Sequence, residues 1–223
     1  MMKFLRRFKD LGIEGGMARW YDTNTRQHRM GEIKNYATEV AAHITDGCSI
    51  LEVAPGPGYL AIELAKLGTY KIIGLDISED FVEIARRNAK EAGVDVAFQQ
   101  GNVSDMPFPD NTFDFIICTA AFKNFKEPLK ALGEMYRVLK QKGICLIIDM
   151  NRNVSNQEIE VLTKNMGVKG REALFMKLTF KYFLRIGAYT KDGFISLISK
   201  TSFKEYDIIE EGIGFHIYLR KSF

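Results

Sequence analysis

Short apolar runs alternate with helical patterns through the middle of the chain, and this alternation limits the folds that it can adopt. The runs are rich in Ile and Val, nearly continuous in apolar residues, and lie at 49–55, 71–77, 96–100, 113–120 and 143–150. Continuous rather than alternating patterning is typical of strands covered on both faces, as in a parallel sheet. The sequence therefore predicts an α/β fold, with a doubly wound, mainly parallel sheet in a three-layer αβα sandwich.

The helices between these runs have recognisable ends. A stripe of apolar residues predicts a helix over 32–44, and Ser78 is placed to cap a helix that Gly93 ends. Pro128 suits the first turn of a further helix, which we expect to continue to Gly143. These helices supply the crossovers that parallel strands require.

After the fifth apolar run the alternation stops. Ser155 and Glu158 form a capping box for one helix, and the aromatic segment 171–185 predicts a second. Thr190 is placed to cap a third helix. The last two apolar runs are separated only by 212–214, so they predict a hairpin, which makes the final strand antiparallel to its neighbour.

The strongest local signal is the segment LEVAPGPGYLAIELAK, in which a strand turns directly into an amphipathic helix. Gly56 and Gly58 let a ligand approach the backbone, and the first turn of the helix offers unpaired N–H groups. Asp76 ends the second strand, where a carboxylate can accept hydrogen bonds from both hydroxyls of a ribose. The spacing of Gly56, Gly58 and Ala61 also suits a nicotinamide dinucleotide, so an NAD-dependent oxidoreductase is an alternative at this point.

The segments GNVSDMPFPDNTFDFIICTAAF and LGEMYRVLKQKGICLIIDM, and the stretch from about Ile33 to Met150 as a whole, resemble the class I S-adenosylmethionine-dependent methyltransferases. The first motif of that family, an acidic and an apolar residue before GxGxG, stands here as Glu52 to Gly58, with Ala54 replacing the first glycine. The resemblance implies a seven-stranded sheet with an antiparallel last strand. It also implies S-adenosyl-L-methionine as the cofactor and S-adenosyl-L-homocysteine as its product.

The resemblance further implies which residues bind this cofactor. Asp76 takes the ribose, Ile77 packs on the adenine, and Asn102 and Val103 meet the adenine edge. Asn102 stands where relatives commonly have Asp, and its amide oxygen can still accept a hydrogen bond from the adenine amino group. The complete set of expected cofactor residues is Tyr21, Glu52, Ala54, Gly56, Gly58, Asp76, Ile77, Asn102, Val103 and Thr119.

Methyl transfer from a sulfonium is a direct in-line displacement, so positioning of the acceptor can supply on the order of 7–11 kcal/mol. A base is needed only where the acceptor must lose a proton. Tyr21, in RWYDTN, lies where relatives often close a tyrosine over the methionine end, and Thr119 is placed to line the donor site. The candidate catalytic residues are Tyr21, Lys123 and Asn124. Packing on the sheet is the alternative for Tyr21, and a solvated loop charge is the alternative for Lys123.

We expect the segment 164–191 to select the acceptor, because insertions at this place often form a lid in the family. It carries seven basic residues and one acidic residue, together with the aromatic residues Phe175, Phe180, Tyr182, Phe183 and Tyr189. This composition suits a small acceptor that is apolar or aromatic and anionic. A pair of amphipathic helices with a solvated basic face is the alternative.

The 223 residues contain no repeat, low-complexity tract or linker, so we expect a single methyltransferase domain. Its expected parts are an N-terminal helical or lid segment at 1–31 and a cofactor-binding core at 32–150. A helical lid insertion at 151–190 and a C-terminal helix with a β-hairpin at 191–223 complete it.

Composition sets limits on partners. The net charge of +3 gives no sign of nucleic-acid binding, although it does not exclude such binding locally. Family members that methylate bases usually carry an Asn/Asp-Pro-Pro-aromatic motif after the fourth strand, and CTAAFKNF lacks it, so the resemblance implies a small-molecule acceptor and no nucleic acid. The three cysteines form no CxxC pair, so no metal site is expected and the thiols are expected to be buried. Without a long apolar stretch or a secretory signal, the chain is expected in the cytoplasm, with at most peripheral membrane contact through 1–11. A protein that binds S-adenosylmethionine without catalysis and engages a partner through its basic lid is a further alternative.

Overall fold

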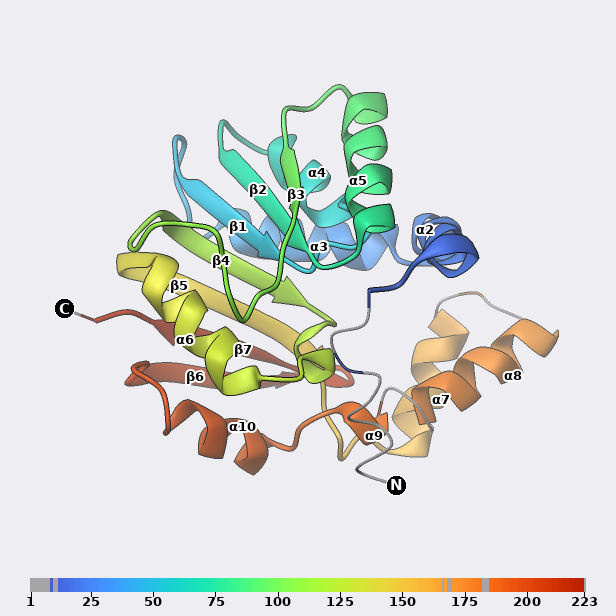
Figure 1. Cartoon of the computed structure of the whole chain (residues 1–223). Helices are drawn as coiled ribbons and strands as arrows, with labels where there is room; N and C mark the ends of the chain where they lie inside the picture. Colours follow the sequence, from blue (N-terminus) through green and yellow to red (C-terminus); the bar gives the residue numbers. More distant parts are fainter. Residues whose placement is uncertain (1–8, 10–11, 166, 168–169, 182–184, 223) are drawn as a thin grey trace.

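The computed structural model describes residues 9, 12–165, 167, 170–181 and 185–222. In this part of the chain, seven strands form one sheet in the order β3-β2-β1-β4-β5-β7-β6 (Figure 1). The strands are β1 (Ser49–Val53), β2 (Lys71–Asp76), β3 (Ala97–Gln100), β4 (Phe113–Thr119), β5 (Leu139–Met150), β6 (Glu205–Glu211) and β7 (Gly214–Arg220). The helices are α2 (Gly15–His28), α3 (Met30–Ala41), α4 (Tyr59–Ala65), α5 (Glu79–Ala92), α6 (Pro128–Val138), α7 (Asn156–Asn165), α8 (Gly170–Thr179), α9 (Arg185–Gly187) and α10 (Lys191–Ile198), with a 3₁₀ turn η2 (Phe122–Asn124).

The sheet has the parallel centre that the apolar runs predict. β1 pairs in parallel with both β2 and β4, so Val53 lies between Leu75 and Cys118. β7 runs antiparallel to β5 and to β6, which confirms the predicted hairpin and the antiparallel last strand. Because parallel strands end at the same edge, the loops after β1, β2, β4 and β5 gather there.

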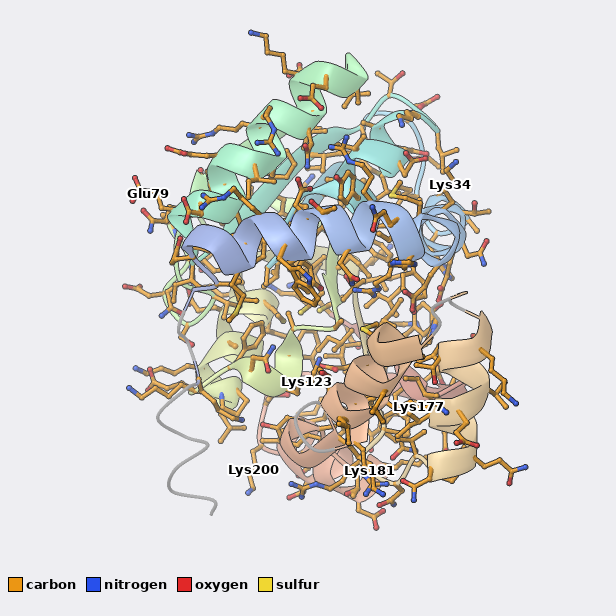
Figure 2. All side chains as sticks on the ribbon, turned by 90° about the vertical axis from the view of Figure 1, so that its right-hand side faces the viewer. Lys34, Glu79, Lys123, Lys177, Lys181 and Lys200 are labelled. Carbon is orange, nitrogen blue, oxygen red and sulfur yellow. The ribbon has the colours of Figure 1, made fainter. Side chains whose placement is uncertain are left out.

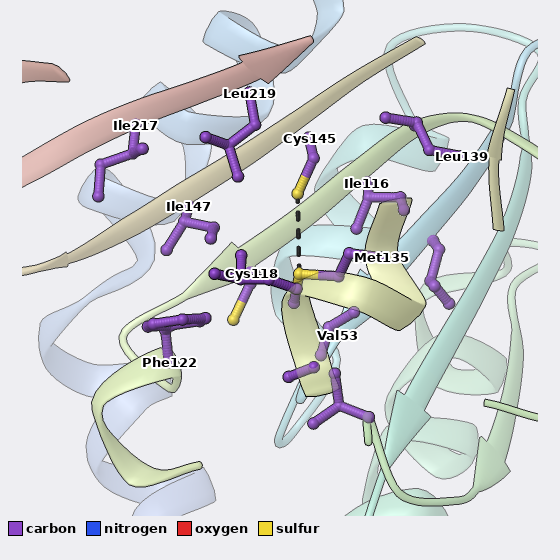
Figure 3. Close-up of a cluster of buried hydrophobic side chains, with 14 of the residues drawn as sticks. Val53, Ile116, Cys118, Phe122, Met135, Leu139, Cys145, Ile147, Ile217 and Leu219 are labelled. Carbon is purple, nitrogen blue, oxygen red and sulfur yellow. Dashed lines mark hydrogen bonds between the residues drawn. The ribbon is translucent and has the colours of Figure 1, made fainter. Parts of the chain in front are cut away.

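Helices cover both faces of the sheet, which confirms the αβα sandwich. α3, α4 and α5 pack on one face and α6 and α10 on the other, each through its own apolar core. Figure 3 shows part of the second core, where Cys145 Sγ lies 3.8 Å from Met135 Sδ. Cys118 and Cys145 are buried, as predicted, but Cys48 is partly exposed because it precedes β1 at the amino edge of the sheet.

The predicted ends of α5 are confirmed, whereas the predicted end of α6 is wrong. Ser78 caps α5 by accepting a hydrogen bond from a backbone N–H of its first turn, and Gly93 ends the helix with a φ of 68°. Pro128 opens α6, also as predicted. α6 does not continue to Gly143, because the backbone becomes extended at Leu139 and pairs with β4.

The segment after β5 is helical, as predicted. Ser155 and Glu158 make the capping box, in which the N–H of each donates to the side chain of the other, at 2.7 and 3.1 Å. Thr190 caps α10. The single helix expected over 171–185 is wrong in extent, because α8 and α9 are separate helices; residues 182–184 lie outside the described residues.

α2 begins the regular structure that is described. The amphipathic pattern at 1–11 falls outside the described residues, apart from Lys9. Among the helices that the structure describes, none is both long enough and apolar enough to cross a membrane.

Candidate functional site

The turn after β1 is built from left-handed backbone. Ala54, Gly56 and Gly58 have φ angles of 55°, 55° and 79°. A Cβ on Gly58 would also lie 2.7 Å from the Phe98 ring and 2.9 Å from Ala85, so packing restricts this position to glycine. Ala54 adopts a conformation that glycine populates freely, at a cost on the order of 1 kcal/mol. The turn therefore keeps a left-handed backbone at Ala54, although this residue stands where the family motif has its first glycine.

Asp76 ends β2 beside this turn. Its Oδ2 accepts a hydrogen bond from the N–H of Gly56, and its Oδ1 accepts one from the N–H of Ser78, both at 2.9 Å. The residue is only 5% exposed; burial raises its pKa, and these backbone hydrogen bonds oppose that increase. Each carboxylate oxygen retains a lone pair for a further donor, such as a ligand hydroxyl.

Glu52 lies beneath the turn. It is buried, and its Oε2 accepts a hydrogen bond from the N–H of Ala61 in α4 at 2.9 Å. Burial raises the pKa of Glu52 to about 8, and the nearby charge of Asp76 adds to the increase. Its carboxyl group therefore ties β1 to α4 and supports the turn from within.

A buried polar network joins α2 to the same turn. Asp22 Oδ1 accepts hydrogen bonds from the Tyr59 hydroxyl at 2.7 Å and from Asn88 Nδ2 at 3.1 Å. Arg26 Nε donates to the Tyr59 oxygen at 2.8 Å, and Asn88 Nδ2 donates to the Pro57 carbonyl at 3.0 Å. Asp22, Tyr59 and Asn88 were not predicted as site residues, because no local motif links positions in three different helices.

Tyr21 extends from α2 toward the turn. Its ring packs edge-on against Phe81 with the centroids 5.6 Å apart, and its hydroxyl accepts a hydrogen bond from Arg29 Nη1 at 3.2 Å. A Cβ on Gly56 would lie 3.8 Å from Tyr21 Cε1. The structure therefore brings Tyr21, Gly56 and Asp76 together at the carboxyl edge of β1 and β2.

Comparison with known proteins identifies the family. A family model described as a methyltransferase domain matches residues 44–210, about three quarters of the chain. The chain belongs to the class I S-adenosylmethionine-dependent methyltransferases. The matched segment contains the left-handed turn, Asp76 and most of the region after β5.

Curated relatives of this methyltransferase match over part of their length. The uncharacterized methyltransferase YcgJ of Bacillus subtilis is 40% identical over 101 residues, which cover 45% of this chain and 40% of the relative. The demethylmenaquinone methyltransferase of Symbiobacterium thermophilum is 38% identical over 136 residues, which cover 56% and 53% of the two chains. The chain thus spans about half the length of the curated relatives that it matches.

Solved structures share the methyltransferase fold over more of the chain. A protein from Methanococcus maripaludis superposes with a TM-score of 0.79 at 23% identity and covers 92% of each chain. A SAM-dependent methyltransferase from Aquifex aeolicus gives a TM-score of 0.65 at 22% identity and covers 86% of this chain and 98% of its own. At these identities the likeness shows the fold alone.

The residues expected at the adenine lie next to Asp76. Ile77 follows it directly and is partly buried. Asn102 Oδ1 accepts a hydrogen bond from the N–H of Ser104 at 2.8 Å, which leaves its amide nitrogen and a second lone pair for other partners. Val103 is buried in the core, so its side chain packs there.

Lys123 lies in a different environment from that of a surface lysine. It is 4% exposed, and its Nζ lies 2.9 Å from Asp149 Oδ1. Its backbone N–H donates to Asp149 Oδ2 at 2.8 Å. The Nζ also donates to the Ala120 carbonyl. The alternative of a solvated loop charge is therefore wrong, and Asp149 is a partner that sequence analysis missed.

The other two candidates at the acceptor side are more accessible. Thr119 ends β4 and is partly exposed, and Asn124 ends η2 and is exposed. β4 pairs in parallel with β1, so Thr119 and Ala54 lie at the same carboxyl edge of the sheet. Figure 2 looks onto this edge, with α2 above Lys123 and α7 and α8 below.

The aromatic residues of segment 164–191 differ in their surroundings. The Tyr189 ring lies 5.7 Å from Phe122 and 5.0 Å from Phe194, so it packs against the core. Phe180 is partly exposed at the end of α8. Outside the described structure are Tyr182, Phe183 and the side chain of Phe175.

Proposed function

We propose that this chain is a cytoplasmic enzyme that transfers the methyl group of S-adenosyl-L-methionine to a small-molecule acceptor. The observation that carries the proposal is the hydrogen bond between Asp76 and Gly56, which fixes a buried carboxylate against the left-handed turn. Membership of the methyltransferase family and the names of the curated relatives support it.

The residues at the edge fit a nucleoside that carries an amino acid. In the proposal, Asp76 accepts hydrogen bonds from the ribose hydroxyls, and Ile77 and Asn102 contact the adenine. Tyr21 covers the amino-acid end from α2, and Thr119 lines the donor site from β4. Glu52 and the network around Asp22, Tyr59 and Asn88 act indirectly, by holding the turn in place.

The chain's own contribution to catalysis is to hold the cofactor, orient the acceptor and exclude water from the site. Bound S-adenosyl-L-methionine supplies an activated methyl group, so no protein nucleophile is required. Tyr21 closes the site from above the turn, and Asn124 orients a polar group of the acceptor. Lys123, held by Asp149, keeps the loop after β4 in position. Such positioning can supply on the order of 7–11 kcal/mol of the barrier reduction.

We propose an apolar or aromatic acceptor with anionic character. Support comes from the basic segment 164–191 and from the exposed part of Phe180 at the lid. The demethylmenaquinone methyltransferase of Symbiobacterium thermophilum, by its name, acts on demethylmenaquinone, a quinone, which agrees with the apolar part of this class. In this arrangement, 1–31 and 151–190 act as lids over a cofactor-binding core at 32–150.

Calorimetry of the purified chain with S-adenosyl-L-homocysteine tests the cofactor half of the proposal. Saturable binding is expected, and NAD should bind far more weakly. Tighter binding of NAD, or no binding of S-adenosyl-L-homocysteine at millimolar concentration, would overturn the proposal.

Transfer of a radiolabelled methyl group across a panel of phenols, quinols and carboxylic acids tests the proposed transfer to a small-molecule acceptor. Cofactor binding without transfer to any acceptor in a broad panel would favour a non-catalytic binding protein.

A further inference from the structure

Two helices outside the core present large apolar side chains to solvent. Met17 and Trp20 of α2 are 65% and 50% exposed, and Leu174 and Leu178 of α8 are 59% and 44% exposed. The members of each pair are three or four residues apart, so they lie on one face of their helix. Large apolar side chains that cluster on a surface mark a site of interaction with a protein, ligand or membrane. We call these four residues the α2–α8 surface.

The two helices lie on the same side of the molecule, beyond the carboxyl edge of the sheet. α2 and α8 both project to the right in Figure 1, and both face the viewer in Figure 2, which is turned by 90°. This is also the side on which the turn after β1 and the loop after β4 open. An object bound to the α2–α8 surface would therefore lie close to the proposed acceptor site.

The segments on this side carry more basic than acidic residues, although α7 contributes the acidic Glu158 and Glu160. Segment 164–191 carries seven basic residues and one acidic residue, whereas the chain outside 1–30 and 164–191 has an acidic excess. Figure 2 labels Lys177 and Lys181 at the lid helices, and Arg19 is exposed between Met17 and Trp20. Lys177 forms an ion pair with Glu160 at 3.1 Å but stays partly exposed.

The exposed apolar side chains and the basic residues beside them together indicate what binds to the α2–α8 surface. Tryptophan and long basic side chains prefer the headgroup region of a bilayer, where an apolar part is buried and a polar part is solvated. Basic residues beside exposed apolar ones are attracted to anionic lipids, and the apolar side chains enter the acyl boundary. A neutral hydrophobic partner would gain nothing from the positive charge.

We propose that the α2–α8 surface docks on bilayers that contain anionic lipids. In this orientation the carboxyl edge of the sheet faces the membrane, so an apolar acceptor dissolved in the bilayer can reach the site directly. Docking itself does not depend on methyl transfer.

The single tryptophan of the chain makes this directly measurable. The full chain is mixed with phosphatidylcholine vesicles, with or without phosphatidylglycerol, and Trp20 fluorescence and co-sedimentation are recorded. A blue shift, quenching by brominated acyl chains and sedimentation are expected with the anionic vesicles, and raised salt should weaken all three. No binding to anionic vesicles, or equal binding to neutral ones, would overturn the proposal.

Variants locate the contact. Leu174→Ser with Leu178→Ser should reduce the partition coefficient by at least about tenfold. Lys177→Gln with Lys181→Gln should reduce it by about fivefold for each charge removed. Leu67→Ser is the matched control, because Leu67 is 51% exposed but lies between α4 and β2, at the opposite edge. An equal loss in the Leu67 variant would refute the assignment to this surface. Calorimetry with S-adenosyl-L-homocysteine, expected to be unchanged in all variants, separates a failure of docking from a failure of the proposed function.

Discussion

The N–H of Gly56 donates a hydrogen bond to Asp76 Oδ2 across 2.9 Å, although 20 positions separate the two residues in the sequence. The second oxygen of Asp76 accepts from Ser78, the N-cap of α5. One carboxylate therefore joins the turn after β1 to the helix after β2. The polar groups proposed to bind the nucleoside are held in place by the chain itself, which reduces the ordering that binding requires.

Asp76→Ala should weaken the binding of S-adenosyl-L-homocysteine. Two charge-assisted hydrogen bonds to a ribose are worth about 1.5–3 kcal/mol each, so a loss of a few kcal/mol is expected. Calorimetry measures the change, and Asp207→Ala serves as a control because the Asp207 side chain is 58% exposed on β6. An unchanged affinity in the Asp76 variant would show that this carboxylate does not bind the ribose.

Ala54→Gly should stabilise the fold. Ala54 has a φ of 55°, a region that costs an alanine on the order of 1 kcal/mol relative to glycine, so the free energy of unfolding should rise by about that amount. Urea denaturation measures it. Ala42→Gly is the matched control: Ala42, the exposed C-cap of α3, has a φ of −70°, and glycine there should cost about 0.4–1 kcal/mol because it makes the unfolded chain more flexible. A loss of stability in both variants would contradict the strain assigned to Ala54.

Sequence patterns predicted the parts of this molecule whose structure is determined by residues close together in the sequence. The apolar runs became the strands, and Ser78, Pro128 and Thr190 begin helices as expected, because capping and strand burial are written in neighbouring residues. The end of α6 was mispredicted, because Leu139 continues the helical apolar pattern but pairs with β4. Here long-range strand pairing outweighed local propensity.

Contacts between distant segments could not be predicted in the same way. Asp22, Tyr59 and Asn88 come from three helices and meet only after the sheet has brought those helices together. Lys123 was expected to contact an acceptor or to be a solvated loop charge, and only the second alternative is wrong, because Lys123 is buried and pairs with Asp149. The one sequence signal for this pair was Asp149 itself, an acidic residue at the end of a continuous apolar strand. A carboxylate buried there needs a partner.

Lys123→Met should destabilise the protein strongly. Removing one partner from a buried ion pair leaves an unpaired charge and typically costs about 3–5 kcal/mol. Lys123→Met combined with Asp149→Asn should recover part of this loss, since the asparagine is neutral and its oxygen can still accept from a backbone N–H. A double-mutant cycle by chemical denaturation checks the coupling. Additive losses would mean that the two side chains do not depend on each other.

Tyr59→Phe should weaken cofactor binding without removing any proposed ligand contact. The Tyr59 hydroxyl donates to Asp22 and accepts from Arg26, so its loss releases α2, and Tyr21 with it, from the turn. The two lost hydrogen bonds are worth about 1 kcal/mol each, which corresponds to an affinity for S-adenosyl-L-homocysteine weaker by roughly fivefold to thirtyfold. Tyr206→Phe, on an exposed tyrosine of β6, is the control. Equal affinities for the wild type and the Tyr59 variant would argue against any coupling between the network and the site.

Glu52→Gln should change how stability depends on pH. Burial raises the pKa of Glu52 to about 8, above its ordinary value of 4.5, so the folded state binds this proton more tightly than the unfolded state. The stabilisation is fully present below the unfolded pKa and is lost as the pH rises through the folded pKa, at up to about 1.4 kcal/mol per pH unit. Glutamine stays neutral, and its oxygen can still accept from Ala61, so the variant lacks this loss. Denaturation from about pH 5 to about pH 8.5 should therefore show the variant gaining on the wild type by up to a few kcal/mol. A constant difference across that range would mean that Glu52 titrates with an ordinary pKa and is not desolvated beneath the turn.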